Sequence, residues 1–368
     1  MAPAFSLQAA TFEELPDWQT DQLHLALPAL ARSCQRLAKQ PDDRPLGPDG
    51  LAGTVGDWRA ACQAINGTAA GDNGALKALL TQEFRPFLVM AGDSDQGLFT
   101  GYYEAELKGA TFPGGDYSWP IYRKPDDMVT VDLGRFRADL EGERLVGRVE
   151  KGRLVPYYTR EEIDRGALAG RNLELLWVDD PADSFFLHVQ GSGQVVLPDG
   201  SRKRIGFAGS NGLPFFAIGR AMIDEGIVSR QDASAQSIMA WLRENPEDGR
   251  AMMARNPRFI FFREIDGDGP IGSQGVALEP GRSLAVDPAF LPLGAPLWLD
   301  TTWPGTDKPL RRLVVAQDTG NAIKGPVRGD LFWGAGAPAL EQAGRMKQKG
   351  RYFLLLPKAV AERRELGS

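Results

Sequence analysis

Residues 318–334 read DTGNAIKGPVRGDLFWG, and this stretch carries most of what the chain implies about its fold and its chemistry. Two aspartates, Asp318 and Asp330, flank a loop that contains Gly325 and Pro326. The second aspartate is followed closely by aromatic residues at positions 332 and 333. Aromatic surface removes water from a neighbouring carboxyl group, so the pKa of that group rises. The stretch therefore predicts a general acid at Asp330.

The tripeptide Asp318-Thr319-Gly320 by itself is that of pepsin-like aspartic peptidases. Such a site needs two carboxylates that share a proton, and a single chain must then carry the tripeptide twice. This chain carries it once, and its N-terminal region has helical periodicity. We therefore reject the peptidase interpretation.

The composition is that of a globular protein and excludes several kinds of site. The chain of 368 residues is long enough for two domains, or one large one, with a proper core. Hydrophobic residues make up 43% of it and charged residues 24%, which are ordinary values for a globular protein. The net charge is −6 and no Lys/Arg-rich run occurs, so no nucleic-acid partner is expected. No apolar run approaches the roughly 20 residues that span a bilayer.

Two histidines and two cysteines leave little room for metal or histidine chemistry. His24 falls in a helical pattern and His188 in a strand-like run, and we interpret both as structural. The spacing of these residues with Cys34 and Cys62 matches no zinc site. We therefore expect carboxylate chemistry with no metal and no cofactor.

The two cysteines, Cys34 and Cys62, fall in neighbouring helix candidates and leave two interpretations open. If the chain is exported they form a disulfide, and if it is cytosolic they are buried thiols. The first residues show no charged n-region and no apolar h-region, so no signal peptide is visible.

The hydrophobic period changes near residue 92 from helical spacing to short strands separated by turns. The helix candidates are 23–37, 58–65, 75–84, 160–165, 215–225 and 229–244. The strand candidates are 98–107, 119–122, 153–158, 175–178, 184–190, 194–197, 203–207, 259–264, 283–286, 296–299, 312–317, 330–333 and 352–356. This pattern favours a mainly β protein with N-terminal helices, in the α+β class, built on a barrel or sandwich.

A series of motifs, in this order, resembles the membrane-bound lytic transglycosylase A family, whose members cleave murein in the bacterial envelope. The motifs are FTGYYE at 99–104, VQGSG at 189–193, GFAGSNG at 206–212, IGR at 218–220, FFR at 261–263, SLAVD at 283–287, AQDTG at 316–320, AIKG at 322–325 and GDLFWG at 329–334. Asp287, Asp318 and Asp330 are similar to the three aspartates that name the family's C-terminal 3D domain.

The resemblance implies a double-psi β-barrel formed by residues 1–100 and 247–368, with the N-terminal helices attached to it. A second, smaller β-barrel domain, residues 101–246, would be inserted, and glycan would lie in the groove between the two. The implied location is the periplasm, with outer-membrane association in a full-length form. The family's lipidated cysteine has no counterpart before Cys34. We expect a monomer, and association with cell-wall synthesis or division proteins is a further expectation.

The implied reaction cleaves the MurNAc-β-1,4-GlcNAc bond of peptidoglycan without water. Asp330 would protonate the glycosidic oxygen and then, as a base, take the proton of the muramoyl C6 hydroxyl while that hydroxyl attacks C1 of its own ring. The product is a 1,6-anhydro sugar, and the tethered nucleophile provides a high effective molarity. Asp318 either assists Asp330 by its charge or is a turn residue, and both interpretations remain open.

Six further residues are candidates for substrate binding by motif match: Tyr103, Gln190, Ser192, Asn211, Lys324 and Asp287. Alternation along a strand puts Tyr102 and Tyr103 on opposite faces, and the motif favours Tyr103 for the groove. Asp287 also fits a turn before Pro288, and Lys324 also fits a solvated loop.

Two alternative functions remain. One is a non-catalytic, expansin-like protein that binds cell-wall polysaccharide, and the complete set of aspartates argues against it. The other is a glycan hydrolase in which a second carboxylate, such as Glu104, acts as the base.

Overall fold

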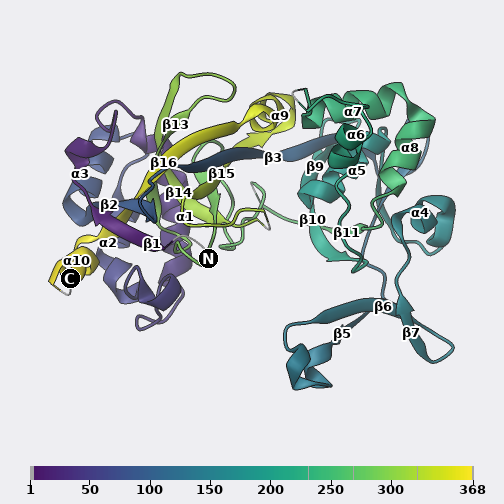
Figure 1. Cartoon of the computed structure of the whole chain (residues 1–368), viewed down its shortest axis with the longest axis horizontal. Coiled ribbons are helices and arrows are strands. Elements are labelled where there is room, and N and C mark those ends of the chain that lie inside the picture. Colours follow the sequence, from purple (N-terminus) through teal and green to yellow (C-terminus); the bar gives the residue numbers. More distant parts are fainter. Residues whose placement is uncertain (1–3, 231, 268, 321, 367–368) are drawn as a thin grey trace. The chain divides into compact units, whose positions relative to one another are not determined.

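The structure is a computed structural model that describes residues 4–230, 232–267, 269–320 and 322–366. The chain divides into two compact units (Figure 1). Unit 1 comprises Met1–Tyr103, Gly267–Gly334 and Pro338–Ser368, and unit 2 comprises Glu104–Asp266 and Ala335–Ala337. Within the described ranges, no helix is both long and apolar enough to cross a bilayer.

Unit 1 combines helices from the N-terminal region with strands from both ends of the chain. Its strands are β1 (Phe5–Ala9), β2 (Phe84–Ala91), the first half of β3 (Gly97–Ala110), β12 (Ser283–Val286), β13 (Pro296–Thr302), β14 (Pro309–Asp318), β15 (Arg328–Ala335) and β16 (Lys347–Pro357). Its helices are α1 (Leu27–Ala38), α2 (Val55–Gly67), α3 (Asn73–Glu83), α9 (Gly336–Arg345) and α10 (Lys358–Leu366), with short helical turns at Phe12–Glu14, Leu23–Ala26 and Pro48–Gly50.

Six strands of unit 1 close into a ring in the order β16, β13, β14, β12, β15 and β3, because β3 also pairs with β16. Strands β12 and β14 run parallel, whereas β12 and β15 are antiparallel with Ala285 opposite Asp330. Strands β2 and β1 continue the sheet outward from β16. The ring therefore places Asp330 of β15 next to strand β3, which lies far away in the sequence.

The core of unit 1 lies inside this ring and beneath the N-terminal helices. Trp18 and Trp298 are buried and meet edge to face, with ring centroids 5.1 Å apart. Phe99 of β3 packs against Tyr352 of β16 in the same way, at 5.4 Å. Because side chains alternate along a strand, the burial of Phe99 places Thr100 and Tyr102 on the opposite face of β3.

Unit 2 has its own sheet, a cover of helices and a separate three-stranded sheet. The main sheet contains the second half of β3, β4 (Trp119–Tyr122), β8 (Glu174–Val178), β9 (Ser192–Val196), β10 (Arg202–Ser210) and β11 (Ile260–Glu264), and the separate sheet contains β5 (Val129–Asp132), β6 (Arg144–Glu150) and β7 (Arg153–Pro156). The helices are α4 (Arg160–Glu162), α5 (Pro181–Gln190), α6 (Ile218–Asp224), α7 (Ala235–Glu244) and α8 (Pro246–Ala254), with helical turns at Leu133–Arg135, Ala138–Leu140 and Ile163–Ala167.

One predicted segment has a different structure, and the strands β1, β2, β5 and β6 and the helices α8, α9 and α10 were not predicted. Residues 184–190, predicted as a strand, belong to helix α5, because Asp180 caps its first turn and Gly191 ends it in a left-handed conformation. These start and stop signals outweigh the strand-like run of apolar residues. Strand β2 was not predicted, because its continuous apolar run follows directly on helix α3.

Candidate active site

Asp330 lies in the middle of β15, with a carboxyl group that is partly buried and has few hydrogen-bond donors. The Thr100 hydroxyl of β3 donates to Asp330 Oδ1 at 2.6 Å, and Arg328 Nη2 donates to Thr100 Oγ1 at 2.9 Å. Burial raises the pKa of Asp330, the Thr100 hydrogen bond and the charge of Arg328 oppose that rise, and the charge of Asp318 adds to it. Asp330 therefore holds its proton more tightly than an ordinary aspartate does.

Asp318, the last residue of β14, is held by many donors. Its Oδ1 accepts from the backbone N–H groups of Ser273 and Thr319 and from the Ser273 hydroxyl, each at 2.9 Å. Its Oδ2 accepts from the Tyr102 hydroxyl at 2.9 Å. These bonds fix a negative charge close enough to Asp330 to raise the pKa of that residue.

Tyr102 links the two carboxyl groups to strand β3. Its ring packs against Phe332, with ring centroids 5.3 Å apart. Burial and the charges of Asp318 and Asp330 raise the pKa of Tyr102 well above its ordinary value. The tyrosine is therefore neutral and acts as a hydrogen-bond donor to Asp318.

Asp287 and Lys324 have the features of a structural turn. The Asp287 side chain is buried, and its oxygens accept from the backbone N–H groups of Ala289 at 3.2 Å and Gly325 at 2.8 Å. Lys324 Nζ lies 3.9 Å from Asp287 Oδ1 on a side chain that is 66% exposed. These contacts favour the turn interpretation of Asp287 over a role in substrate binding.

Two of the sequence-predicted groove residues are buried in the fold, which corrects their assignment. Asn211 has no exposed surface, because its amide donates to the carbonyls of Tyr158 and Pro257 and accepts from the Phe259 N–H. Tyr103 is 7% exposed, whereas its neighbour Tyr102 contacts Asp318. Strand alternation separates the two tyrosines as expected, but the assignment of their faces was the wrong way round.

The remaining two candidates, Gln190 and Ser192, belong to unit 2, whereas Asp318 and Asp330 belong to unit 1. Gln190 is the last residue of α5 and Ser192 the first of β9, and both are half-buried.

Sequence reasoning missed three partners of the aspartates, namely Thr100, Ser273 and Arg328. Thr100 and Tyr102 are two positions apart in a strand, so they share a face, and this pattern could have identified them together. Ser273 lies in a loop with no local signal for its contact with Asp318.

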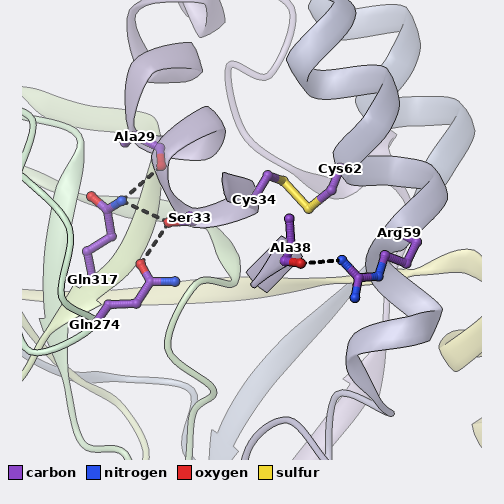
Figure 2. Close-up of a disulfide and its surroundings, with 8 residues drawn as sticks. All are labelled: Ala29, Ser33, Cys34, Ala38, Arg59, Cys62, Gln274 and Gln317. Atoms are coloured by element: carbon purple, nitrogen blue, oxygen red, sulfur yellow. Dashed lines mark hydrogen bonds between the residues drawn. A yellow bond between two sulfur atoms is a disulfide. The ribbon is translucent and has the colours of Figure 1, made fainter. Parts of the chain in front are cut away.

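A buried polar network connects the loop around Asp318 to helix α1 (Figure 2). Ser33 of α1 donates to Gln274 Oε1 at 2.8 Å and accepts from Gln317 Nε2 at 2.8 Å. Gln317 directly precedes Asp318, and Gln274 directly follows Ser273. The next residue of α1, Cys34, forms a disulfide with Cys62 of α2.

Comparison with known proteins gives matches over most of the chain. Residues 98–263 match the MltA specific insert domain, and residues 282–356 match the 3D domain. Membrane-bound lytic murein transglycosylase A of Vibrio cholerae is 31% identical over 277 residues, which cover 72% of this chain and 67% of that protein.

Solved structures match along nearly the full length. The lytic transglycosylase LtgG of Burkholderia pseudomallei is 41% identical, with a TM-score of 0.69 and 97% of each chain covered. MltA of Escherichia coli, solved with bound chitohexaose, is 25% identical with a TM-score of 0.67, covering 96% of this chain and 94% of that one. The chain therefore belongs to the membrane-bound lytic murein transglycosylase A family.

Proposed function

We propose that this protein, a lytic murein transglycosylase by family, cleaves peptidoglycan with Asp330 as its single acid and base. The assignment of Asp330 rests on the surroundings of its carboxyl group. It is partly buried, its pKa is raised, and its one hydrogen-bond donor in the described part of the chain is the Thr100 hydroxyl. Such a carboxyl group keeps its proton to a higher pH than an ordinary aspartate does, and it can release that proton to a sugar oxygen.

The reaction requires two proton transfers, and both can run through Asp330. In the first, the protonated carboxyl gives its proton to the glycosidic oxygen between MurNAc and GlcNAc as the bond to C1 breaks. In the second, the resulting carboxylate accepts the proton of the muramoyl C6 hydroxyl while that oxygen attacks C1 of its own ring. The products are a 1,6-anhydro-MurNAc end and a free GlcNAc end, and Asp330 is protonated again.

Asp318 supports this chemistry as a fixed negative charge and not as a second base. Four hydrogen-bond donors already occupy its oxygens and hold the group in one position. A fixed carboxylate of this kind stabilises the positive charge that develops at C1 in an oxocarbenium-like transition state. Tyr102 and Ser273 hold the carboxylate in place.

The hydrolase alternative receives little support from Glu104. Its side chain is 1% exposed and pairs with Arg204 at 3.2 Å, so it cannot reach a water molecule at a sugar ring. Burial raises the pKa of Glu104. A general base must be open to its substrate, and the buried Glu104 is not.

The closed ring of six strands, with its parallel pair β12 and β14, supports a double-psi barrel for unit 1. The disulfide supports an exported protein, which fits the periplasm, since disulfides persist in oxidising compartments.

Product analysis tests the proposed function. Purified peptidoglycan sacculi incubated with the protein should release fragments that end in 1,6-anhydro-MurNAc, which mass spectrometry distinguishes by the absence of one water. Fragments with reducing MurNAc ends would instead establish a hydrolase. Sacculi that bind the protein but release nothing would support a purely binding role.

A further inference from the structure

Unit 2 contains a cavity of about 520 Å³ that the proposed reaction does not use. It lies between β4, the segment from α4 to Gly166, the first turns of α5, and α8. Its walls include the aromatic side chains of Trp119, Tyr122, Phe185 and Phe259. A cavity of this size, with apolar walls and a few charged groups, has the usual properties of a small-molecule site.

Arg160 places a buried positive charge in this cavity. Arg160 is 4% exposed, and its guanidinium donates to the backbone carbonyls of Asn256 at 3.2 Å and Arg258 at 2.9 Å. The group also lies over the rings of Phe185 and Phe259, 4.8 and 5.2 Å from their centroids. Burial lowers the pKa of Arg160 to about 10, so the group is still charged at neutral pH.

In the described part of the chain no carboxylate forms an ion pair with this charge, although Asp164 interacts with it at longer range. Among the described residues, none places a carboxylate oxygen within ion-pair distance of Arg160, and its other side-chain contact is with His188 Nδ1 at 3.2 Å. Burial and the charge of Arg160 hold the pKa of His188 well below its ordinary range, so the imidazole is neutral. A buried cation without an anionic partner is costly in a folded protein, and a ligand that carries an anion would offset that cost.

Other charged residues that line the cavity include Arg250, Arg165 and Asp164. Arg250 of α8 lines the cavity with an exposed side chain and makes no ion pair within the described chain. Arg165 pairs with Glu161 at 2.6 Å and so has its own partner. Asp164 is the acidic group that faces Arg160, and burial raises the pKa of Asp164 despite the opposing charge of Arg160. Arg160 and Arg250 thus line the cavity without an ion pair in the described chain, beside the aromatic residues and the buried Asp164.

We propose that this cavity binds an organic carboxylate that carries an apolar group, with the carboxylate between Arg160 and Arg250. Arg250 is suited to hold the two oxygens of a carboxylate in its planar fork, whereas Arg160 adds mainly its buried charge because its Nε and Nη2 already donate to backbone carbonyls. The stem peptides of peptidoglycan end in free carboxylates beside methyl groups, and this choice of source rests on the proposed function. Free acylated amino acids carry the same chemistry from another source.

Calorimetric titration tests the proposal on the full chain with the Asp330→Asn substitution, so that binding is measured without cleavage. The probes are the stem tetrapeptide L-Ala-γ-D-Glu-diaminopimelyl-D-Ala, N-acetylphenylalanine, and the form of each in which every carboxyl group is an amide. We expect saturable binding of at least one acid and at least about 10-fold weaker binding of its amide, since hydrogen bonds to charged groups are the strong ones. The acid that binds identifies the source.

Three variants locate the site. Arg250→Gln should weaken binding by about 10-fold, because it removes an unpaired cation at the rim. Arg165→Gln is the matched control and should change binding by less than about 2-fold, because that cation is already paired. Ala254→Trp should abolish binding by filling the cavity, with circular dichroism as the check on folding.

Three results would overturn the proposal: neither acid binds, acid and amide bind equally, or Ala254→Trp binds as well as its parent. None of these results bears on Asp330, because cleavage of sacculi is measured separately. A chain that binds neither acid but still releases 1,6-anhydro fragments would therefore refute this site alone.

Discussion

Asp287 and Asp330 lie at neighbouring positions of two paired strands, yet their surroundings give them opposite properties. Asp330 sits opposite Ala285 in the β12–β15 pair, and Asp287 follows the end of β12. The Asp287 carboxylate binds two backbone N–H groups, whereas the Asp330 carboxyl has one hydroxyl donor. The backbone donors around Asp287 stabilise a turn, whereas burial with a single donor raises the pKa of Asp330 and favours a proton that can be given away.

Asp330→Asn should have the largest effect on activity. An amide of the same shape cannot give up a proton, so release of 1,6-anhydro fragments should fall by about 10²–10⁴-fold. Asp287→Asn is the matched control and should retain activity to within about a factor of ten. A similar loss in both variants would remove the distinction between the two aspartates.

Stability should change in the opposite order. Asp287→Ala removes the acceptor of two partly buried N–H groups and should cost about 0.5–1.5 kcal/mol per hydrogen bond in the free energy of unfolding. The raised pKa of Asp330 means that this residue stabilises the fold at low pH, and the contribution is lost as pH rises through the folded-state pKa. Asp330→Asn should therefore be at least as stable as the parent near neutral pH. Urea unfolding measures both, and a destabilised Asp330→Asn would contradict this interpretation.

Thr100→Val should move the pH dependence of the reaction. The Thr100 hydroxyl favours the ionised form of Asp330, so its removal should raise the pKa of Asp330 further. Because the acid must be protonated to act, the alkaline limb of the kcat/KM profile should move to higher pH. Thr301→Val is the matched control, because it removes a buried hydroxyl elsewhere in the ring and should leave the limb in place. An unmoved limb in Thr100→Val would show that this hydroxyl does not set the proton affinity of Asp330.

Lys324→Ala should have the smallest effect. The lysine is mostly exposed and 3.9 Å from Asp287, so its removal should change the unfolding free energy by less than about 0.5 kcal/mol. A larger loss in urea unfolding would mean that Asp287 depends on this charge as well as on the backbone.

Local sequence predicted the strand of Asp330 and the alternation of Tyr102 and Tyr103, because both follow from residue pattern alone. It could not predict which tyrosine faces the aspartates, since alternation sets parity and not direction. The contact between Thr100 and Asp330 spans 230 positions, and the contact between Ser273 and Asp318 spans 45. Such contacts depend on the closure of the ring, which periodicity does not describe.

For the same reason, the sequence could not predict that Asn211 is buried. Its amide joins backbone groups of two segments, at Tyr158 and at Pro257 and Phe259, which become neighbours of Asn211 only after unit 2 has folded. By contrast, the sequence does contain the signals for the helix that includes His188, because Asp180 and Gly191 mark its two ends.

The disulfide between Cys34 and Cys62 has a consequence for the stability of helix α1. It closes a separation of 28 residues, which corresponds to about 3–4 kcal/mol of stability from the reduced entropy of the unfolded chain. Ser33 of helix α1, next to Cys34, forms hydrogen bonds with Gln274 and Gln317. These two glutamines directly adjoin Ser273 and Asp318 in the sequence. If Cys34 and Cys62 stayed reduced, the chain would lack this cross-link, and we expect the helix that contacts Gln274 and Gln317 to be less stable.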